Sequence, residues 1–228
     1  KYEGSTLGRQ ELMAEIIEEV PNAMWTWTNL DKNRIKYDDM DKLPEFLSIV
    51  LAIDPATSNR NSSAQTGMCV AAYGEDDHFY ILHLDAIKTT PEQWARRAIR
   101  LFEQYNCDKM IAEVNNGGDL VASVIRAANP LQKVISVHAS RGKTTRAEPI
   151  AALYEQNRVH HLGTFVDAEK QMCAFNPLEN PYGLKDMVDA MVWAMTWLVE
   201  TTQGRNTYKP IVGGHRDKLQ KFKDTFKY

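Results

Sequence analysis

Two acidic residues of this sequence stand where short apolar runs end. Asp54 closes the run 46–53 and precedes Pro55, which disfavours helix, while Glu113 closes the run 110–112. Short apolar runs bounded by turn residues are typical of strands buried on both faces. A carboxylate at the mouth of such a strand needs a partner or a cation, because burying it alone is costly. The alternatives are a turn-forming Asp54 and a Glu113 on the surface of an edge strand.

A second pair of acids opens a helix near the end of the chain. Asp186 and Asp189 are three residues apart, so they share one face of its first turn. Apart from Asp189, Thr196 is the only polar residue between positions 187 and 199, which predicts a helix buried nearly all round. Capping and the helix dipole explain acids here equally well, but neither role prevents metal binding.

Acids that end two strands and open a buried helix can converge into one anionic pocket. No thiolate pair and no His-x-x-x-His spacing accompanies them, so the donor set favours hard cations such as Mg²⁺ or Mn²⁺. Two such ions about 4 Å apart activate water and stabilise the leaving oxygen in phosphodiester hydrolysis.

Basic residues follow the fifth expected strand. Arg141, Lys143 and Arg146 stand in a segment that we expect to be a loop, with a helix starting near Pro149. Such a loop can bind DNA phosphates, and Lys143 can stabilise charge near the scissile bond. A solvated charged loop is the alternative.

The intervening elements predict an α/β fold. We expect strands near 46–54, 67–73, 78–84, 109–114, 133–138 and 159, and helices near 91–105, 119–128, 149–156, 168–175 and 186–201. The turn 74–77 indicates an antiparallel hairpin, and Thr90 followed by Pro91 indicates a helix start. Three early strands followed by alternating helices and strands predict a mixed sheet with helices on both faces.

Both ends of the chain differ from this core. Residues 1–44, with a possible helix over 11–20, are expected to lie outside it, either as an arm on a neighbouring domain or as a cover for the sheet. Residues 203–228 form a basic tail: from position 201 onward seven Lys and Arg face two Asp, a net +5, so the rest of the chain carries −8. The tail fits a partner of negative charge, or is solvated.

The composition gives no sign of a membrane span. The chain has 228 residues, 43% hydrophobic and 25% charged, which is ordinary for a globular protein. No run of about 18 uncharged apolar residues occurs, so no membrane span is expected. The three distant cysteines, Cys69, Cys107 and Cys173, indicate a reducing compartment.

Five segments resemble the nuclease domain of the large terminase subunit of tailed bacteriophages and gene transfer particles. They are Ile53–Pro55, Ile111–Gly118, Arg141–Lys143 with Arg146, Ala151–Val159 and Asp186–Ala190. The resemblance covers about residues 45–200, and it implies a ribonuclease H-like fold and metal-dependent cutting of concatemeric double-stranded DNA during packaging in the host bacterial cytoplasm.

The resemblance also implies roles for the acids. Asp54, Glu113 and Asp186 would bind metal, with Asp189 as a fourth or supporting acid; which of the last two is the main ligand stays open. Gly142-Lys-Thr144 imitates the end of a phosphate-binding loop, but Val137 stands where that motif needs glycine.

The resemblance implies an ATPase motor domain ahead of the nuclease domain, and the incomplete phosphate-binding loop indicates that this sequence does not contain it. We expect a nuclease domain over 45–202, with residues 1–44 as the connection to an ATPase domain of the full-length protein. The portal and the small terminase subunit are the further partners implied. The alternatives are a Holliday-junction resolvase-like nuclease and a non-catalytic module that docks on the portal or capsid.

Overall fold

The computed structural model of the chain describes residues 20–55, 65–114, 120–139, 142–181 and 183–202. The tail and most of the helix expected over 11–20 lie outside these residues. The strands are β1 (Phe46–Asp54), β2 (Thr66–Gly74), β3 (Phe79–Ile87), β4 (Lys109–Glu113), β5 (Ile135–Val137) and β6 (Val159–His161). The helices are α2 (Trp27–Lys32), the 3₁₀ helix η1 (Tyr37–Lys42), α3 (Pro91–Gln104), α4 (Leu120–Ala128), α5 (Lys143–Glu155), α6 (Val166–Cys173) and α7 (Asp186–Thr202).

The six strands form one mixed sheet in the order β5-β4-β1-β2-β3-β6. β2 pairs antiparallel with both β1 and β3, whereas the pairs β1–β4, β4–β5 and β3–β6 are parallel. The carboxyl ends of the five other strands therefore meet at one end of the sheet, where open α/β sheets bind their ligands.

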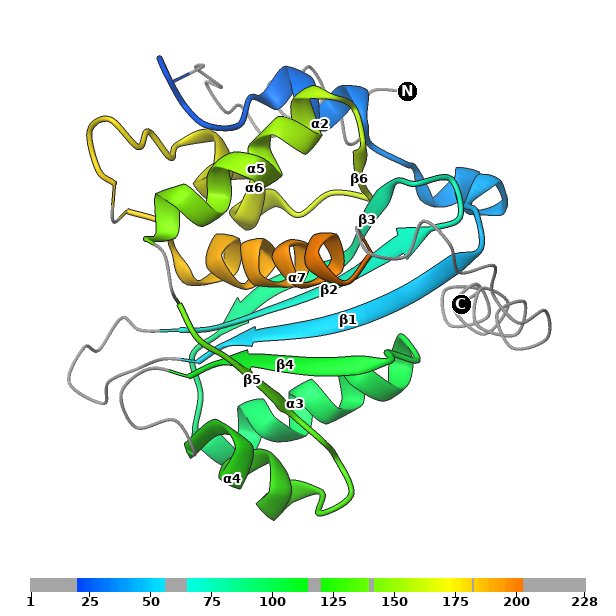
Figure 1. The fold of residues 1–228 in the computed structure, drawn as a ribbon, viewed down its shortest axis with the longest axis vertical. Coiled ribbons are helices and arrows are strands. Elements are labelled where there is room, and N and C mark those ends of the chain that lie inside the picture. The colour runs from blue at the N-terminus through cyan, green and yellow to red at the C-terminus, as the bar shows by residue number, and fades with distance from the viewer. Residues whose placement is uncertain (1–19, 56–64, 115–119, 140–141, 182, 203–228) are drawn as a thin grey trace.

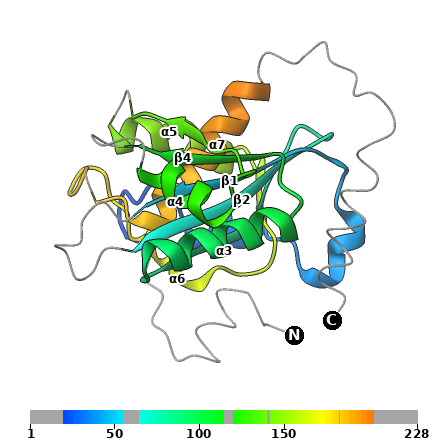
Figure 2. The ribbon, with the colours of Figure 1, turned by 90° about the horizontal axis from the view of Figure 1, so that it is seen from below.

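Helices cover both faces of the sheet, so the predicted layered α/β fold is confirmed. α7 packs across β2 and β1 with α5, α6 and α2 outside it, and α3 and α4 cover the opposite face (Figures 1 and 2). Alternation along β1 divides the core: Val50 and Ala52 face α7, whereas Ile49, Leu51 and Ile53 face α3 and α4. Among the described residues, none of the helices has the length and apolarity needed to span a bilayer.

Local sequence signals explain several element boundaries. The Thr90 hydroxyl accepts a hydrogen bond from the Gln93 N–H, and Pro91 is the first residue of α3, as predicted. The turn between β2 and β3 is closed by the Gly74 N–H, which donates to the His78 carbonyl at 2.9 Å.

The segment before β1 is part of the core, contrary to expectation. Trp25, Trp27 and Leu30 are buried in the cluster that α5, α6 and α7 form on the sheet. The Met24 N–H donates to the Phe175 carbonyl at 2.9 Å. Its apolar side chains therefore cover the protein's own helices; the role of residues 1–44 as a connection to an ATPase domain stays a prediction.

α5 begins earlier than expected. Its first residue is Lys143, so Lys143 and Arg146 lie on a helix, and Pro149 is inside it. Proline is favoured at the first position of a helix, where its missing N–H costs nothing, so position 149 is the start that the sequence predicts. Here the helix continues through Pro149, with Ile150, Ala151 and Tyr154 buried on its inner side.

Candidate metal centre

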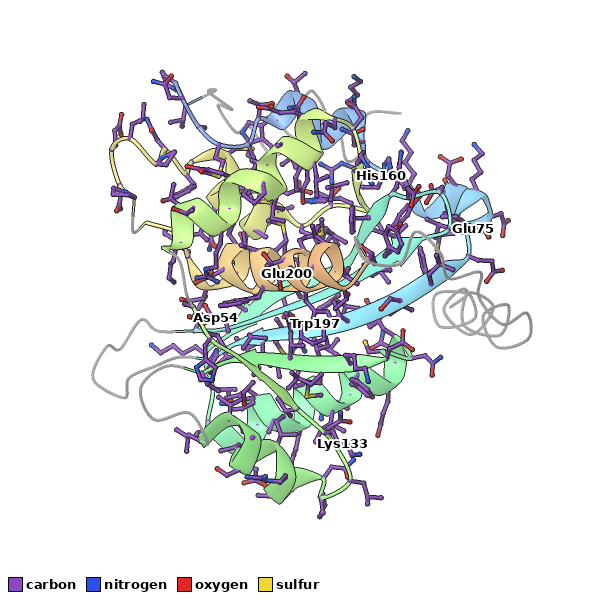
Figure 3. The ribbon with its side chains drawn as sticks, in the orientation of Figure 1. Asp54, Glu75, Lys133, His160, Trp197 and Glu200 are labelled. Atoms are coloured by element: carbon purple, nitrogen blue, oxygen red, sulfur yellow. The ribbon has the colours of Figure 1, made fainter. Side chains whose placement is uncertain are left out.

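Two strands bring Asp54 and Glu113 side by side. β1 and β4 are parallel neighbours in which Ile53 pairs with Ala112, and the two acids are the next residues of their strands. Alternation places both side chains on the face that α7 covers. Asp54 is 6% exposed and Glu113 is 5% exposed. Figure 3 shows Asp54 at the end of the sheet, below the first turns of α7.

The third acid of the cluster is Asp189, one turn into α7. Its side chain is completely buried, and one oxygen each of Asp54, Glu113 and Asp189 lie within 4.8 Å of one another. Asp186 is half-buried and accepts a hydrogen bond from the Gln65 N–H at 3.1 Å. Of the two acids on this helix, Asp189 is therefore the one that joins the strand-end pair.

Gly67 allows α7 to come this close to the sheet. It pairs with Asp54 in the β1–β2 ladder. A Cβ atom at position 67 would lie 2.1 Å from the Asp186 carbonyl oxygen, which no real contact permits. The missing side chain thus sets the height of the first turn of α7 above the strand ends.

Two cations from α5 flank Asp189. The Lys143 ammonium nitrogen is 2.5 Å from one carboxylate oxygen, and an Arg146 guanidinium nitrogen is 3.3 Å from the other. Both Asp189 oxygens are buried. A divalent cation bound here would share this carboxylate with Lys143 and Arg146.

Trp193 links the two halves of the cluster. Its indole N–H donates a hydrogen bond of 2.9 Å to Glu113 Oε2. The Arg146 guanidinium carbon is 4.1 Å from the centre of its ring, a cation–π distance. The buried Trp193 side chain thus orients both the Glu113 carboxylate of β4 and the Arg146 guanidinium of α5.

Burial and charge repulsion perturb the acids. Burial, together with repulsion from Asp189, Glu113 and Asp186, raises the pKa of Asp54 well above its usual value, although Lys143 opposes the rise. Burial is the largest cause of this rise. Burial lowers the pKa of Lys143, but attraction to Asp189, Asp54 and Glu113 outweighs it and the net pKa is raised.

The donor set fits a hard divalent cation. Three carboxylates face the two cations Lys143 and Arg146, which leaves one uncompensated negative charge when all are ionised. Carboxylate oxygens are the ligands that Mg²⁺ and Mn²⁺ prefer. Asp54, Glu113 and Asp189 are the residues placed to hold such an ion.

The three basic residues expected to bind DNA differ in their exposure and in their neighbours. Arg141 lies outside the described residues, and Lys143 is partly exposed beside Asp189. Arg146 is only 7% exposed and faces the cluster. DNA contacts by these three residues stay predictions.

Sequence comparison places this chain in a family. A model of the terminase RNaseH-like domain matches residues 51–197, a span that includes Asp54, Glu113 and Asp189. The chain belongs to this family. No curated protein matches the sequence.

Solved terminase nuclease domains share its fold. The nuclease domain of the large terminase subunit gp2 of bacterial virus Sf6 is 10% identical, with a TM-score of 0.55 over 76% of this chain and 98% of that one. The large terminase nuclease from thermophilic phage G20c is 15% identical, with a TM-score of 0.53 over 77% of this chain and 98% of that one. The ribonuclease H-like fold is therefore confirmed.

Sequence reasoning missed Gly67 and Trp193. Trp193 stands four residues after Asp189 and hence on the same face of α7. A buried tryptophan needs a partner for its N–H, and that requirement was the available signal. Nothing in the sequence marks Gly67, because its role depends on how closely α7 docks.

Proposed function

We propose that this terminase-family chain is a metal-dependent nuclease that cuts double-stranded DNA during viral genome packaging in a bacterial host. The observation that carries the proposal is the convergence of Asp54, Glu113 and Asp189 at the carboxyl ends of the strands. Membership of the family and the shared fold with phage terminase nucleases support it. A variant of the Sf6 domain was solved with manganese, which supports Mn²⁺ or Mg²⁺ as the cofactor.

Asp54, Glu113 and Asp189 would hold the ions. Two ions bound together supply an activated water on one side of the scissile phosphodiester and stabilise the leaving oxygen on the other. The buried setting of the acids limits their hydration and strengthens their attraction for cations. Asp186 stays outside this set, because the oxygens that lie within 4.8 Å of one another belong to Asp54, Glu113 and Asp189.

Lys143 and Arg146 have separate tasks in this proposal. The Lys143 ammonium is partly exposed and held by Asp189, so it can face a phosphate at the cluster and stabilise the charge that develops there. Arg146 is buried between Asp189 and Trp193, so it holds these two side chains in position.

The partners follow from the family. Double-stranded DNA is the proposed substrate, and an ATPase domain of the same full-length protein, the portal and the small terminase subunit are the proposed partners. The basic tail would contact DNA or an acidic surface of these partners.

Cleavage by matched variants tests the proposal. Plasmid nicking in manganese should disappear in Asp54→Ala and Asp189→Ala and should persist in Asp186→Ala, with circular dichroism confirming that each variant is folded. An Asp54→Ala protein that cuts at the wild-type rate would refute it. A wild type that cuts four-way junctions but not linear duplex would favour the resolvase alternative.

A further inference from the structure

An open groove lies beside the end of β3 and the first turns of α3. Its volume is about 460 Å³, and its lining includes four basic side chains, Lys88, Arg96, Arg97 and Arg100, with Thr89 and Gln93 between them. Nothing in the metal centre uses these residues. We propose that this groove binds the phosphate backbone of duplex DNA whose scissile bond lies at the acid cluster.

The groove is at the same end of the sheet as the acids. Asp54 pairs with Gly67, and Gly67 pairs with Ala86, so these three residues form one row across β1, β2 and β3. Two strand spacings separate Asp54 from Ala86 along this row, about 10 Å. Lys88 follows two residues beyond Ala86, where β3 has ended and the chain turns into α3.

That separation suits a double helix. The major groove of B-DNA is about 12 Å wide, which is comparable with the roughly 10 Å between Asp54 and the end of β3, where the basic groove begins. The acids face α7 and the basic groove is on the α3 side, so the duplex would lie across the end of the sheet (Figures 1 and 2).

The outer side of α3 continues the basic surface. Trp94, Ala95, Ala98 and Leu101 are buried on its inner side, which leaves Arg96 and Arg100 exposed on the outer side. These two residues are separated by a rise of about 6 Å along the helix. Successive phosphates of one strand are about 3.4 Å apart along the DNA axis, so the two arginines can contact phosphates two positions apart.

Ion pairs inside the groove keep it partly neutral without filling it. Arg96 contacts Glu92 at 2.8 Å, with both side chains more than half exposed, and Arg97 contacts Asp85. An exposed pair of this kind contributes little to stability, so its arginine can turn to a phosphate at small cost. The lining itself holds four cations and no acid, on a body that is otherwise acidic.

The inference rests on the proposed function, because it uses the acid cluster to set where the duplex lies. Duplex DNA is favoured over an acidic protein since the groove and the cluster share one end of the sheet. An acidic protein would have no reason to be held beside the cluster.

The test compares two double variants of the full chain. Lys88→Gln with Arg100→Gln removes two charges from the groove. Lys109→Gln with Lys133→Gln removes two exposed charges at the starts of β4 and β5, which is the opposite end of the sheet because these strands are parallel to β1. Figure 3 shows Lys133 far from Asp54.

Binding is measured by fluorescence anisotropy of a labelled linear duplex in EDTA over a series of salt concentrations. Each phosphate contact contributes about 0.9 to the slope of log affinity against log salt, so the groove variant should lose about 1.8. The affinity at 0.1 M salt should fall by up to about 60-fold on this relation. The opposite-end variant should match the wild type.

The outcomes separate this inference from the proposed function. In manganese, the groove variant should show a raised KM for duplex with kcat unchanged. If the wild type cuts DNA, two results would overturn the groove assignment alone. One is an equal loss of DNA affinity in both double variants, and the other is an unchanged affinity in the groove variant. A groove variant that loses binding to polyglutamate but keeps its affinity for duplex would assign the groove to an acidic protein instead. A wild type that cuts no DNA in any divalent ion would refute the proposed function itself.

Discussion

Replacing Trp193 by phenylalanine removes one hydrogen bond from the metal centre while keeping an aromatic ring beneath Arg146. The lost interaction is the indole N–H donated to Glu113 Oε2 at 2.9 Å. A hydrogen bond to a charged group contributes about 1.5–3 kcal/mol. At about 1.4 kcal/mol for each factor of ten, this predicts a loss of manganese affinity of about 10- to 150-fold. Groups that orient metal ligands typically contribute a similar factor, about 10- to 100-fold.

Isothermal titration with manganese measures the affinity directly, and thermal melting gives an independent check. At a fixed excess of manganese, a 10- to 100-fold weaker site reduces the ion's contribution to the free energy of unfolding by about 1.4–2.7 kcal/mol. For a chain of this size that corresponds to a melting temperature about 3–11 °C lower than that of the wild type in the same buffer.

Trp197→Phe is the matched control, because it makes the same chemical change one turn further along α7, away from Asp54 (Figure 3). Equal manganese affinity in Trp193→Phe and the wild type would refute the positioning role, and so would an equal loss in Trp197→Phe.

Three further predictions follow from other contacts. Gly67→Ala should displace the first turn of α7 by roughly 1 Å, because its Cβ would lie 2.1 Å from the Asp186 carbonyl oxygen; a displacement of that size predicts about a 100-fold loss of plasmid cleavage. In metal-free protein, the raised pKa of Asp54 means that the folded state binds a proton more tightly than the unfolded state. Stability should therefore increase as pH falls through that raised pKa. When melting temperature is measured from about pH 8 to about pH 5, Asp54→Asn should depend less on pH than the wild type. Arg34→Met should lower the melting temperature by about 6–12 °C, because it removes one partner of the buried Glu169 carboxylate at a cost of about 3 kcal/mol.

Each of these variants has a control in the same chain. Gly142→Ala adds a methyl group where no atom lies within 4 Å, so it should leave cleavage unchanged. Lys42→Met breaks an ion pair with Asp39 that is largely exposed, so it should barely change the melting temperature. A Gly67→Ala protein as active as Gly142→Ala would show that α7 can shift without cost to the site.

The pH profile has an internal check as well. Burial raises the pKa of Glu169, but hydrogen bonds and charge from His161 and Arg34 outweigh it and lower the pKa to about 2. Its stabilising contribution is present above its unfolded pKa and is lost progressively as pH falls from that value to about 2, below the window of the Asp54 experiment. A metal-free wild type whose stability decreases from pH 8 to pH 5 would contradict the role assigned to Asp54.

The sequence by itself determined the layered α/β fold, the two strand-end acids and the start of α3. Each is encoded locally: an apolar run followed by a carboxylate and a turn, or a threonine followed by Pro91. The terminase resemblance was equally visible, because its segments are contiguous in the chain and hold Asp54 and Glu113.

Only the tertiary structure distinguished Asp189 from Asp186. Both acids are in the first turn of α7, and a difference of three residues leaves them on one face of an isolated helix. The docking of α7 on β2, which Gly67 permits, turns Asp189 to the cluster and leaves Asp186 to the Gln65 N–H.

The contacts of Lys143, Arg146 and Trp193 were likewise decided only by the tertiary structure. A basic segment has the same composition whether its side chains face solvent or a buried carboxylate. What turned Lys143 and Arg146 inward is the uncompensated charge of Asp189, which α7 brings to α5 from more than forty residues along the chain. The same packing gave the Trp193 N–H its partner on β4, in keeping with the general rule that buried polar groups are hydrogen-bonded.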